Sequence, residues 1–283
     1  MSADIFTLIK ANYNIFTKAE KKVADFIMAD PRRVLYMSIT DLADACDVGD
    51  TSVFRFCRDL KLKGYQDFKV MVAQSLGSDN DTSQITGMVQ PEDSTEVMVK
   101  KLLSTNVSAL NETYDLINIE KIQKTVDWML ESQRIVFFGV GASLITAMDA
   151  CNKFMRIIPN VTMTMDAHLQ TMSAALLSDK DLAVIFSYSG STKDTIDMAR
   201  LAKSRNSKVI AITKFAKSPL TEYADLVLLC GSNEGPLQGG SLSAKLSQLF
   251  LLDVLYMEYF QRTLDKSKHN KEFTANAISE KLY

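Results

Sequence analysis

Four hydroxyl side chains lie within six residues of one another in the second half of the chain. Ser187, Ser189, Ser191 and Thr192 surround Gly190, whose missing side chain lets the backbone turn sharply. Hydroxyls donate hydrogen bonds to phosphate, and backbone N–H groups at the start of a helix also favour an anion. One Ser or Thr would be enough to cap an ordinary helix. The cluster therefore favours a phosphate site, with a simple capped turn as the alternative.

An apolar segment precedes this cluster, and a helix is expected to follow it. Residues 182–186 are all apolar, which is typical of a strand buried on both faces of a parallel sheet. The helix is expected to run from about Lys193 to Ser204, with Thr192 or Ser191 as its N-terminal cap. A strand, a hydroxyl-rich turn and a helix N-terminus together make an anion site.

Apolar segments elsewhere in the second half of the chain predict four further strands. They cover residues 134–140, 161–165, 209–213 and 226–230, and helical patterns lie between most of them. Strands that alternate with helices predict an α/β domain with a three-layer, doubly wound, five-stranded parallel sheet and right-handed crossovers. Ligands of such sheets bind at the carboxyl ends of the strands.

A second turn of small residues, Gly139-Val-Gly141-Ala-Ser143, follows the first predicted strand. In the flavodoxin-like strand order 2-1-3-4-5 the first and third strands are neighbours, so Ser143 and Ser187 would share one crevice. An alternative for this turn is a dinucleotide fingerprint, G-x-G-x-x-G, with Asp166 on the ribose. Its third glycine falls at Leu144, so the phosphate interpretation is preferred.

The first 76 residues predict a separate all-α domain. Thr17 and Glu20 have the spacing of a capping box at the start of a helix, and Asp30-Pro31 ends that helix. Two more short helices are expected on either side of a tight turn at 47–50, one from Thr40 and one over about 51–60. Two short helices around a glycine-containing turn resemble helix-turn-helix geometry.

The second of these helices has an apolar inner face and a polar, basic outer face. The inner positions are Val53, Phe56, Cys57 and Leu60, and the outer positions include Thr51, Ser52, Arg55 and Arg58. Residues 51–70 hold five basic and two acidic side chains, a net charge of +3. We expect Thr51, Ser52 and Arg55 to read base edges. Phosphate contacts are expected from Arg58, Lys61, Lys63 and Lys69. A solvated face on a small helical bundle is the alternative.

Residues 77–93 are polar, contain Gly and Pro and show no sustained period, so they predict a linker. A long helix is expected from Ser94 or Thr95 to about Ile117, followed by another over 120–130. Two interpretations of the long helix remain open, namely a contact with a partner chain and a cover for its own sheet.

The composition limits the classes of protein that the chain can belong to. A length of 283 residues allows two domains, and a net charge of −2 excludes a globally basic nucleic-acid coat. The first residues lack the pattern of a signal peptide, and no apolar run approaches the roughly 18 residues of a membrane span. The four cysteines form no C-x-x-C pair, so we expect small buried residues and neither a metal site nor disulfides. We predict a cytoplasmic protein without cofactors.

Short motifs follow one another in a fixed order through the helical domain: Thr17-Lys-Ala-Glu20-Lys, Ile27-Met-Ala-Asp30-Pro31, Met37-Ser-Ile-Thr-Asp-Leu-Ala43, Val53-Phe-Arg-Phe-Cys-Arg58 and Gly64-Tyr-Gln-Asp-Phe-Lys69. This series resembles the N-terminal helix-turn-helix domain of RpiR-family (MurR/RpiR) transcriptional regulators over nearly all of residues 5–72. One departure is Gly49, since the family usually has Ser as the cap of the recognition helix. Gly is a tolerated cap, and Asp50 is an alternative one residue later.

Two segments of the second domain, Phe138-Gly-Val-Gly-Ala-Ser143 and Phe186-Ser-Tyr-Ser-Gly-Ser-Thr192, resemble the phosphosugar loops of the sugar isomerase (SIS) domain. Asp166-Ala-His-Leu-Gln170 is similar to the segment between them in RpiR regulators. The resemblance covers about 130–260 and implies which residues bind a phosphosugar. Ser187, Ser189 and Thr192 would hold the phosphate and Ser143 the sugar, within loops that include Gly141, Gly190 and Ser191. Lys193 is a further candidate cation, or it points to solvent.

A sugar isomerase also needs a base that moves a proton next to a carbonyl. Ser241-Leu-Ser-Ala-Lys245-Leu-Ser-Gln248 is similar to the segment of glucosamine-6-phosphate synthase that carries a Lys and a catalytic Glu. Lys245 is kept, but the Glu becomes Gln248, and an amide cannot take the proton. His168 and Glu234 remain candidate bases. We favour a structural, hydrogen-bonded role for His168 and the role of a loop carboxylate for Glu234.

These interpretations predict a transcriptional regulator and not an enzyme. Its helix-turn-helix domain, 1–76, would bind a near-palindromic DNA operator, and a linker, 77–93, would lead to a SIS domain with flanking helices, 94–283. The SIS domain would sense a phosphorylated sugar or sugar acid, and the working unit would be a homodimer or a higher homo-oligomer. The alternatives are a phosphosugar isomerase with an accessory helical domain and an interaction module that does not bind DNA.

Overall fold

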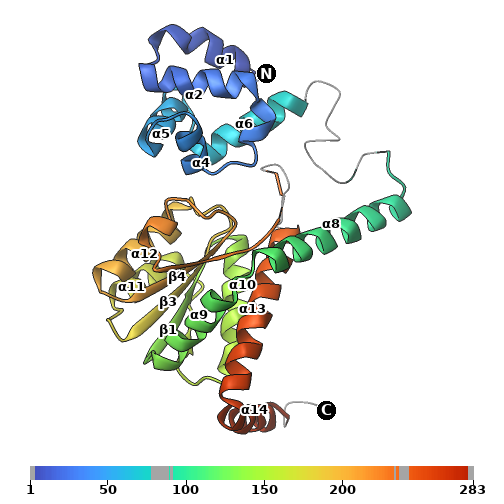
Figure 1. Ribbon diagram of the computed structural model, residues 1–283, viewed down its shortest axis with the longest axis vertical. Helices are drawn as coiled ribbons and strands as arrows, with labels where there is room; N and C mark the ends of the chain where they lie inside the picture. The colour runs from blue at the N-terminus through green and yellow to red at the C-terminus, as the bar shows by residue number, and fades with distance from the viewer. Residues whose placement is uncertain (1–3, 78–88, 90–91, 233, 236–241, 280–283) are drawn as a thin grey trace. The chain divides into compact units, whose positions relative to one another are not determined.

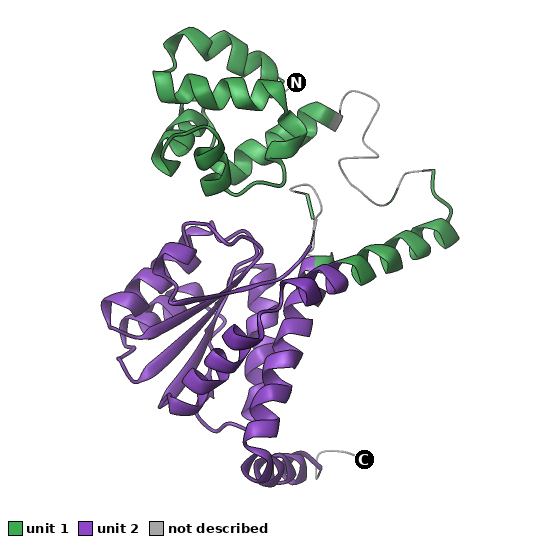
Figure 2. Ribbon diagram, viewed as in Figure 1, with its two compact units in different colours: residues 1–108, 233–243 green, residues 109–232, 244–283 purple. Residues whose placement is uncertain are grey.

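The computed structural model describes residues 4–77, 89, 92–232, 234–235 and 242–279. The chain divides into two compact units (Figure 2), one of residues 1–108 with 233–243 and one of 109–232 with 244–283. Helix α8, Thr95–Leu116, has residues in both units. Most of the predicted linker, 77–93, lies outside the described residues, so the domain boundaries at 76 and 94 stay a prediction.

The first unit begins with a series of short helices (Figure 1). They are α1 (Ile5–Asn12), the 3-10 helix η1 (Tyr13–Ile15), α2 (Lys18–Ala29), α3 (Pro31–Val34), α4 (Ile39–Ala45), α5 (Asp50–Asp59) and α6 (Tyr65–Gly77). Their core includes the rings of Phe16, Phe56 and Phe68, with centroids 5.0 Å and 5.7 Å apart in successive pairs. The predicted inner positions of α5 are all buried: Val53, Phe56, Cys57 and Leu60.

Side-chain caps decide where these helices begin. The predicted capping box is confirmed, since the Glu20 carboxylate accepts the Thr17 N–H at 2.8 Å and the Thr17 hydroxyl accepts the Glu20 N–H. Helix α4 begins at Ile39, one residue earlier than predicted, because Ser38 and Asp41 form a second capping box. These caps satisfy N–H groups that a helix leaves without partners inside its first turn.

The second unit contains a five-stranded parallel sheet in the order β2-β1-β3-β4-β5, which confirms the predicted topology. Its strands are β1 (Arg134–Phe138), β2 (Val161–Thr162), β3 (Asp181–Phe186), β4 (Lys208–Thr213) and β5 (Leu226–Leu229). Its helices are α9 (Ile119–Glu131), α10 (Ala142–Met155), α11 (Ala167–Ala175), α12 (Lys193–Ser204), the 3-10 helix η2 (Thr221–Tyr223), α13 (Leu242–Arg262) and α14 (Leu264–Ser279).

The sheet separates two apolar cores (Figure 1). On one face, side chains such as Phe137 and Phe186 pack with buried residues of α9, α10 and α13. On the other face, Phe138 and Ile185 pack with buried residues of α11 and α12. Every residue of β3 is buried, as expected for a central strand of a parallel sheet.

Three strands are shorter than predicted, and the shortening of β5 is the loss of Cys230 alone. Strand β1 ends at Phe138, because the polar groups of the Gly139 backbone pair with a side chain instead of a strand. Strand β2 keeps only Val161 and Thr162, which pair with Ile135 and Val136 at one edge of the sheet. All four cysteines are buried free thiols, as predicted, and burial raises the pKa of Cys57 to about 12. Among the described helices, none has the length and apolar character needed to cross a lipid bilayer.

Candidate functional site

The two predicted phosphosugar loops leave the same edge of the sheet from neighbouring strands. Strands β1 and β3 pair in parallel up to Phe138 and Ile185, so Gly139–Ser143 and Ser187–Thr192 start side by side. Strands β1 and β3 are not consecutive in the sequence but are neighbours in the sheet. The strand order reverses between them, which makes this a topological switch point. This is where open α/β sheets bind ligands.

The loop after β3 is fastened to the end of β4. The Ser187 N–H donates to the Ile212 carbonyl at 3.1 Å, and the Lys214 N–H donates to the Tyr188 carbonyl at 3.1 Å. The Tyr188 hydroxyl donates to the Ser232 carbonyl at 2.9 Å. These bonds hold the loop in a preformed shape before any ligand arrives.

The loop hydroxyls differ in how far they are buried. Ser187 is 2% exposed, and its hydroxyl accepts from the Thr195 hydroxyl at 3.3 Å. Ser189, Ser191 and Thr192 are half-buried. The Ser191 N–H donates to the Ser189 hydroxyl at 3.2 Å, and the Ser191 hydroxyl donates to the Ser189 carbonyl at 3.1 Å. One short turn therefore brings all four predicted hydroxyls together, with Ser187 at its base.

Gly190 is required at the centre of this turn for two reasons. Its φ of +60° lies in the region that side chains disfavour. A β-carbon on Gly190 would also lie 2.1 Å from the Ser218 hydroxyl oxygen, so the loop packs directly on Ser218. The Ser218 hydroxyl is buried and has no hydrogen-bond partner among the described residues.

The helices that follow the two loops both begin without a side-chain cap. Thr192 is the N-cap residue of α12, as predicted, but neither its hydroxyl nor that of Ser191 bonds to the first turn. Gly141 is the N-cap of α10, is exposed and has a φ of +57°. In α10 the N–H groups of Ser143 and Leu144 already donate to the Val140 and Gly141 carbonyls, at 3.2 Å and 3.1 Å, so the N–H groups left for another acceptor are those at the start of α12. With hydroxyls beside them, they suit a phosphate.

The loop after β1 presents Ser143 on the first turn of α10, where it is half-buried. This turn is tight, because a β-carbon on Gly139 would lie 2.6 Å from the Ser143 carbonyl oxygen. Gly139 thus sets the path of the backbone, and Ser143 is the hydroxyl that this loop offers.

Sequence reasoning missed the residue that holds this first loop in place. The Gln170 amide on α11 accepts the Gly139 N–H at 3.1 Å and donates to the Gly139 carbonyl at 3.0 Å. Its side chain is 1% exposed. The one available signal was that Gln170 closes the segment 166–170, which resembles the corresponding segment of RpiR regulators.

Replacing Gln170 with alanine should therefore destabilise the protein and weaken ligand binding through Ser143. Two buried backbone groups would lose their partners, which costs about 2–4 kcal/mol in the free energy of unfolding. Urea titration measures this loss. The matched control is Thr171→Ala, which removes only a hydroxyl bonded within its own helix, to Ala167. An equal effect of both substitutions would contradict the clamping role of Gln170.

Gln170→Glu tests the same contact by pH. An ionised carboxylate accepts the Gly139 N–H but has no proton to donate to the Gly139 carbonyl, so burial and this contact both favour the protonated acid. A raised pKa in the folded state means that stability relative to the wild type is highest at low pH and falls as the pH rises through and above the unfolded pKa of about 4.3. A difference from the wild type that does not vary with pH would contradict this.

The residues considered for proton transfer lie in different settings. His168 is exposed on α11 and makes no hydrogen bond to the described residues, so the expected structural, hydrogen-bonded histidine is not observed. Glu234 accepts from the Ser243 hydroxyl at 3.0 Å, as a loop carboxylate would. Gln248 is 2% exposed, and its amide oxygen accepts from the Thr146 hydroxyl at 2.8 Å. Lys193 is exposed, and Lys245 is half-buried.

The predicted helix-turn-helix is formed by α4, a turn at 46–49 and α5. Asp47 adopts a φ of +51° in this turn, and its carboxylate accepts from the Lys22 ammonium at 2.8 Å. That hydrogen bond lowers the pKa of the Asp47 carboxyl. Gly49 is the N-cap of α5, and Asp50 is the first helical residue. The Asp50 carboxylate accepts from the Thr40 hydroxyl at 2.7 Å, which ties the start of α5 to α4.

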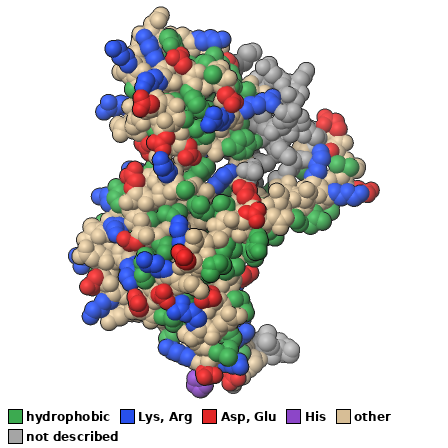
Figure 3. Space-filling view, in the orientation of Figure 1, with side chains coloured by type: hydrophobic (Ala, Val, Ile, Leu, Met, Phe, Trp, Pro, Cys, Tyr) green, Lys and Arg blue, Asp and Glu red, His purple; other side chains and the backbone are tan. Residues whose placement is uncertain are grey.

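Most of the predicted DNA-contacting side chains lie on the surface of this unit. Thr51, Arg55, Arg58, Lys61 and Lys63 are exposed, and Ser52 is half-buried. The space-filling view shows basic side chains distributed over the visible face of the helical unit (Figure 3).

Lys69 does not fit a phosphate contact. It is 5% exposed, its ammonium donates to the Met37 carbonyl at 3.3 Å, and it lies 5.3 Å from the centre of the Tyr65 ring. The charge pattern that suggested a DNA contact carried no information on this burial. Lys69 instead connects α6 to the segment before α4, so we remove it from the expected interface.

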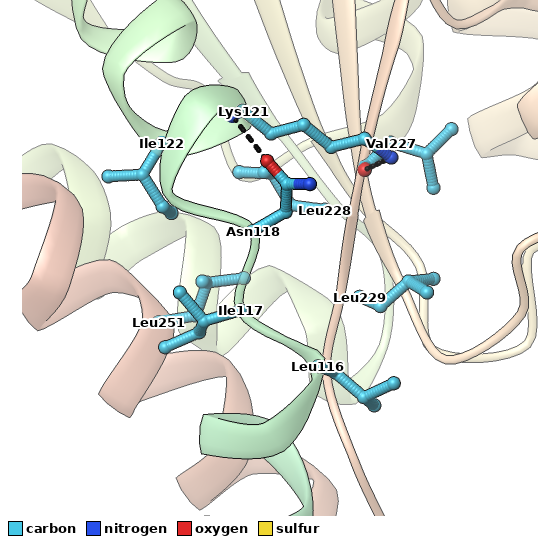
Figure 4. Close-up of a pocket in the computed structure, with 9 residues that line it drawn as sticks. All are labelled: Leu116, Ile117, Asn118, Lys121, Ile122, Val227, Leu228, Leu229 and Leu251. Atoms are coloured by element: carbon cyan, nitrogen blue, oxygen red, sulfur yellow. Dashed lines mark hydrogen bonds between the residues drawn. The ribbon is translucent and has the colours of Figure 1, made fainter.

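A small recess in the second unit lies away from the loops (Figure 4). It is lined mainly by apolar residues of α8, α9, β5 and α13, and the Lys121 ammonium beside it donates to the Val227 carbonyl at 3.2 Å. Its apolar walls do not suit a phosphorylated sugar.

Comparisons with known proteins agree with this arrangement. Residues 3–79 match the family described as "Helix-turn-helix domain, rpiR family", and residues 129–258 match the SIS domain. An uncharacterized HTH-type transcriptional regulator of Haemophilus influenzae is 36% identical over 281 residues, covering 99% of this chain and 98% of the relative. The Escherichia coli HTH-type transcriptional regulator HexR is 32% identical over 275 residues, covering 97% of this chain and 94% of HexR.

A solved structure is similar over both units. The Vibrio vulnificus NanR protein complexed with ManNAc-6P matches with a TM-score of 0.85 and 30% identity, covering 98% of this chain and 99% of NanR. A helix-turn-helix unit, a parallel sheet with two hydroxyl-bearing loops and relatives along the whole chain lead to one conclusion. The chain belongs to the RpiR family of helix-turn-helix transcriptional regulators that carry a SIS domain.

Proposed function

We propose that this regulator binds a phosphorylated sugar or sugar acid at its two SIS loops and thereby changes its affinity for an operator. The observation that carries the proposal is the N-terminus of α12, which lacks a side-chain cap, beside the clustered hydroxyls of its loop and next to the loop that leads into α10 from the neighbouring strand. Similarity to the NanR protein complexed with ManNAc-6P supports a phosphosugar as the ligand.

The roles of the loop residues follow from their positions. Ser187, Ser189 and Thr192 donate hydrogen bonds to the phosphate, together with N–H groups at the start of α12. Ser143 donates to a sugar hydroxyl from the neighbouring loop. Gly141, Gly190 and Ser191 shape the two turns.

The roles in DNA binding follow the outer face of α5. Thr51, Ser52 and Arg55 near its start contact base edges, while Arg58, Lys61 and Lys63 contact phosphates and set the register. Double-stranded operator DNA with a near-palindromic sequence is the expected partner. A regulator of this kind acts where the chromosome is, so we propose a cytoplasmic location.

The SIS site is proposed as a sensor and not as an isomerase. An aldose–ketose isomerase needs a base within reach of the substrate. The buried side chain beside α10 is the amide of Gln248, which is held by Thr146 and takes up no proton at neutral pH. Relatives along the whole chain are described as transcriptional regulators, which supports the same view.

Sensing requires that the ligand bind two arrangements of the protein with different affinities. A coupling free energy of about 1–3 kcal/mol, or roughly 5- to 150-fold in operator affinity, is typical. A ligand that binds both arrangements equally would change nothing, however tightly it binds.

A thermal-shift screen of phosphorylated sugars and sugar acids tests the proposal, with each dephosphorylated compound as its matched control. A ligand at about 100 times its Kd adds about 2.7 kcal/mol to the free energy of unfolding, which should raise Tm by several degrees. The phosphorylated form should act and the dephosphorylated form should not. If no phosphorylated compound raises Tm, the proposed ligand class is wrong. Conversion of a binding sugar to its isomer, followed by NMR, would favour the isomerase alternative.

We also propose that the working unit is at least a homodimer. One recognition helix reads only a few base pairs, so two copies on a near-palindrome are the usual solution. Helix α8 carries exposed apolar side chains in one row, namely Val99, Leu103, Val107 and Tyr114. Hydrophobic side chains are visible along α8 in Figure 3. Such a row favours the first interpretation of this helix, a contact with a partner chain.

Sedimentation at micromolar concentration should show a species of at least twice the 31.6 kDa chain mass. Leu103→Glu with Val107→Glu should shift it toward the monomer, because two charges would be buried without partners. Ser104→Glu, an exposed position on the same helix, is the matched control and should leave the mass unchanged. A 31.6 kDa species alone, with and without DNA, would rule the dimer out.

A further inference from the structure

The outer face of the recognition helix α5 carries an aromatic ring as well as polar and basic groups. Phe54 is 46% exposed, whereas the rings of Phe16, Phe56 and Phe68 in the same unit are buried. A single exposed apolar side chain is common on protein surfaces, but Phe54 lies on the face of α5 that carries the proposed DNA-contacting residues.

The position of Phe54 is defined by helix geometry. Thr51, Phe54, Arg55 and Arg58 are spaced i, i+3, i+4 and i+7, so they share one side of α5. The ring lies over Gly64, since a β-carbon there would be 3.4 Å from the Cε2 atom of Phe54. Gly64 thus leaves room for the ring beside the helix. The ring stays next to the basic groups that attract DNA.

The basic surroundings of Phe54 limit which group of the DNA major groove it can contact. The groove admits an α-helix, and its base edges offer hydrogen-bonding groups and one apolar group, the C5-methyl of thymine. Arg55 and Arg58 provide the charge that attracts the duplex, and Phe54 on the same side of α5 has no polar atom to pair with a base edge. The thymine methyl is the group on the base edges that matches an apolar ring.

We propose that Phe54 is a specificity-determining residue that recognises a thymine through its C5-methyl group. The inference rests on the proposed function of α5 as the helix that reads the operator. It adds an apolar readout to the polar readout assigned to Arg55. Burial of one methyl group corresponds to roughly a four-fold gain in affinity.

The experiment uses the full chain and DNA selected by that chain from random duplexes. Each thymine of the selected site is replaced in turn by deoxyuridine, which lacks only the methyl group. Replacement at one thymine position of each half-site should weaken binding roughly four-fold per half-site. Replacement at the other thymines should have little effect.

Variants assign the effect to Phe54. Phe54→Ala should bind the thymine and deoxyuridine sites equally at the sensitive position, while Phe54→Leu should keep part of the difference. Ile15→Ala, which removes an exposed apolar side chain of η1 in the same unit, should keep the full difference. The scan with the unaltered chain needs no variant, so it remains informative if Phe54→Ala does not fold.

The outcomes separate the inference from the proposed function. If no thymine position is sensitive, or if Phe54→Ala keeps the sensitivity, the inference is overturned while DNA binding by α5 stands. If the chain selects no DNA at all, the operator-binding function and the inference fall together. A Phe54→Ala chain that loses self-association and keeps the methyl effect would assign the ring to a contact between copies.

Discussion

Replacing Ser187 and Ser189 together with alanine is expected to abolish the rise in Tm that a phosphorylated sugar produces. Each hydroxyl would donate a charge-assisted hydrogen bond to the phosphate, and such bonds contribute about 1.5–3 kcal/mol each. Losing two of them should weaken binding by roughly a hundred-fold or more. Thermal shift and isothermal titration with the same ligand measure the loss.

The structure defines the controls for this experiment. Ser204→Ala removes a hydroxyl at the far end of α12 that bonds within its own helix, to Leu201, so the ligand response should remain. Operator binding without ligand should also survive in the double variant, because the helix-turn-helix unit is unchanged. A double variant with a full ligand response would place the phosphate elsewhere.

A purely structural role of these hydroxyls would give a different result in the same Tm measurements. The Ser189 hydroxyl accepts the Ser191 N–H, and the Ser187 hydroxyl accepts from Thr195 beneath the loop. If these bonds only hold the turn, each single alanine variant should lower Tm without ligand and keep the ligand-induced shift. If the hydroxyls bind phosphate, the shift falls more than the baseline Tm.

Arg55→Ala is expected to relax operator specificity at one base pair of each half-site. Arg55 is exposed near the start of α5, where a guanidinium can donate two hydrogen bonds to a guanine edge. Its loss should cost about 1–3 kcal/mol on the preferred site and much less on sites changed at that base pair. Competition binding against a set of single-base variants of the selected operator measures the change.

Lysine variants provide the contrast. Lys61→Ala and Lys63→Ala should weaken all sequences alike and lower the salt dependence of binding by about one ion each. Lys69→Ala should act on stability, because its buried ammonium donates to the Met37 carbonyl and packs on Tyr65. An Arg55→Ala protein with unchanged operator preference would remove Arg55 from base readout.

Much of the architecture could be predicted because it depends on local patterns. The apolar spacing of Val53, Phe56 and Cys57 defines one buried helix face wherever the helix packs. Likewise, the unbroken apolar run of 182–186 is typical of a strand covered on both faces, and β3 is fully buried. The alternation of strands and helices then limited the sheet to few topologies, among them the observed order.

The hydroxyl cluster at 187–192 was also visible without a structure, because its members are sequence neighbours. Proximity along the chain makes proximity in space almost certain for a tight turn around a glycine such as Gly190. Whether Thr192 caps its helix was a different question. That answer depends on side-chain orientation, and in the structure neither Thr192 nor Ser191 makes the cap bond.

Only the tertiary structure revealed the contacts between residues far apart in the chain. Gln170 on α11 contacts the backbone of Gly139 in the loop after β1, and Ser218 fills the space beside Gly190. Lys69 looked like a phosphate contact from its charge, yet packing places its ammonium against Met37. Local sequence sets which segments become helices, strands and turns, because periodicity and capping act over a few residues. The partners of a buried polar group depend on how those segments pack, and no local pattern carries that information.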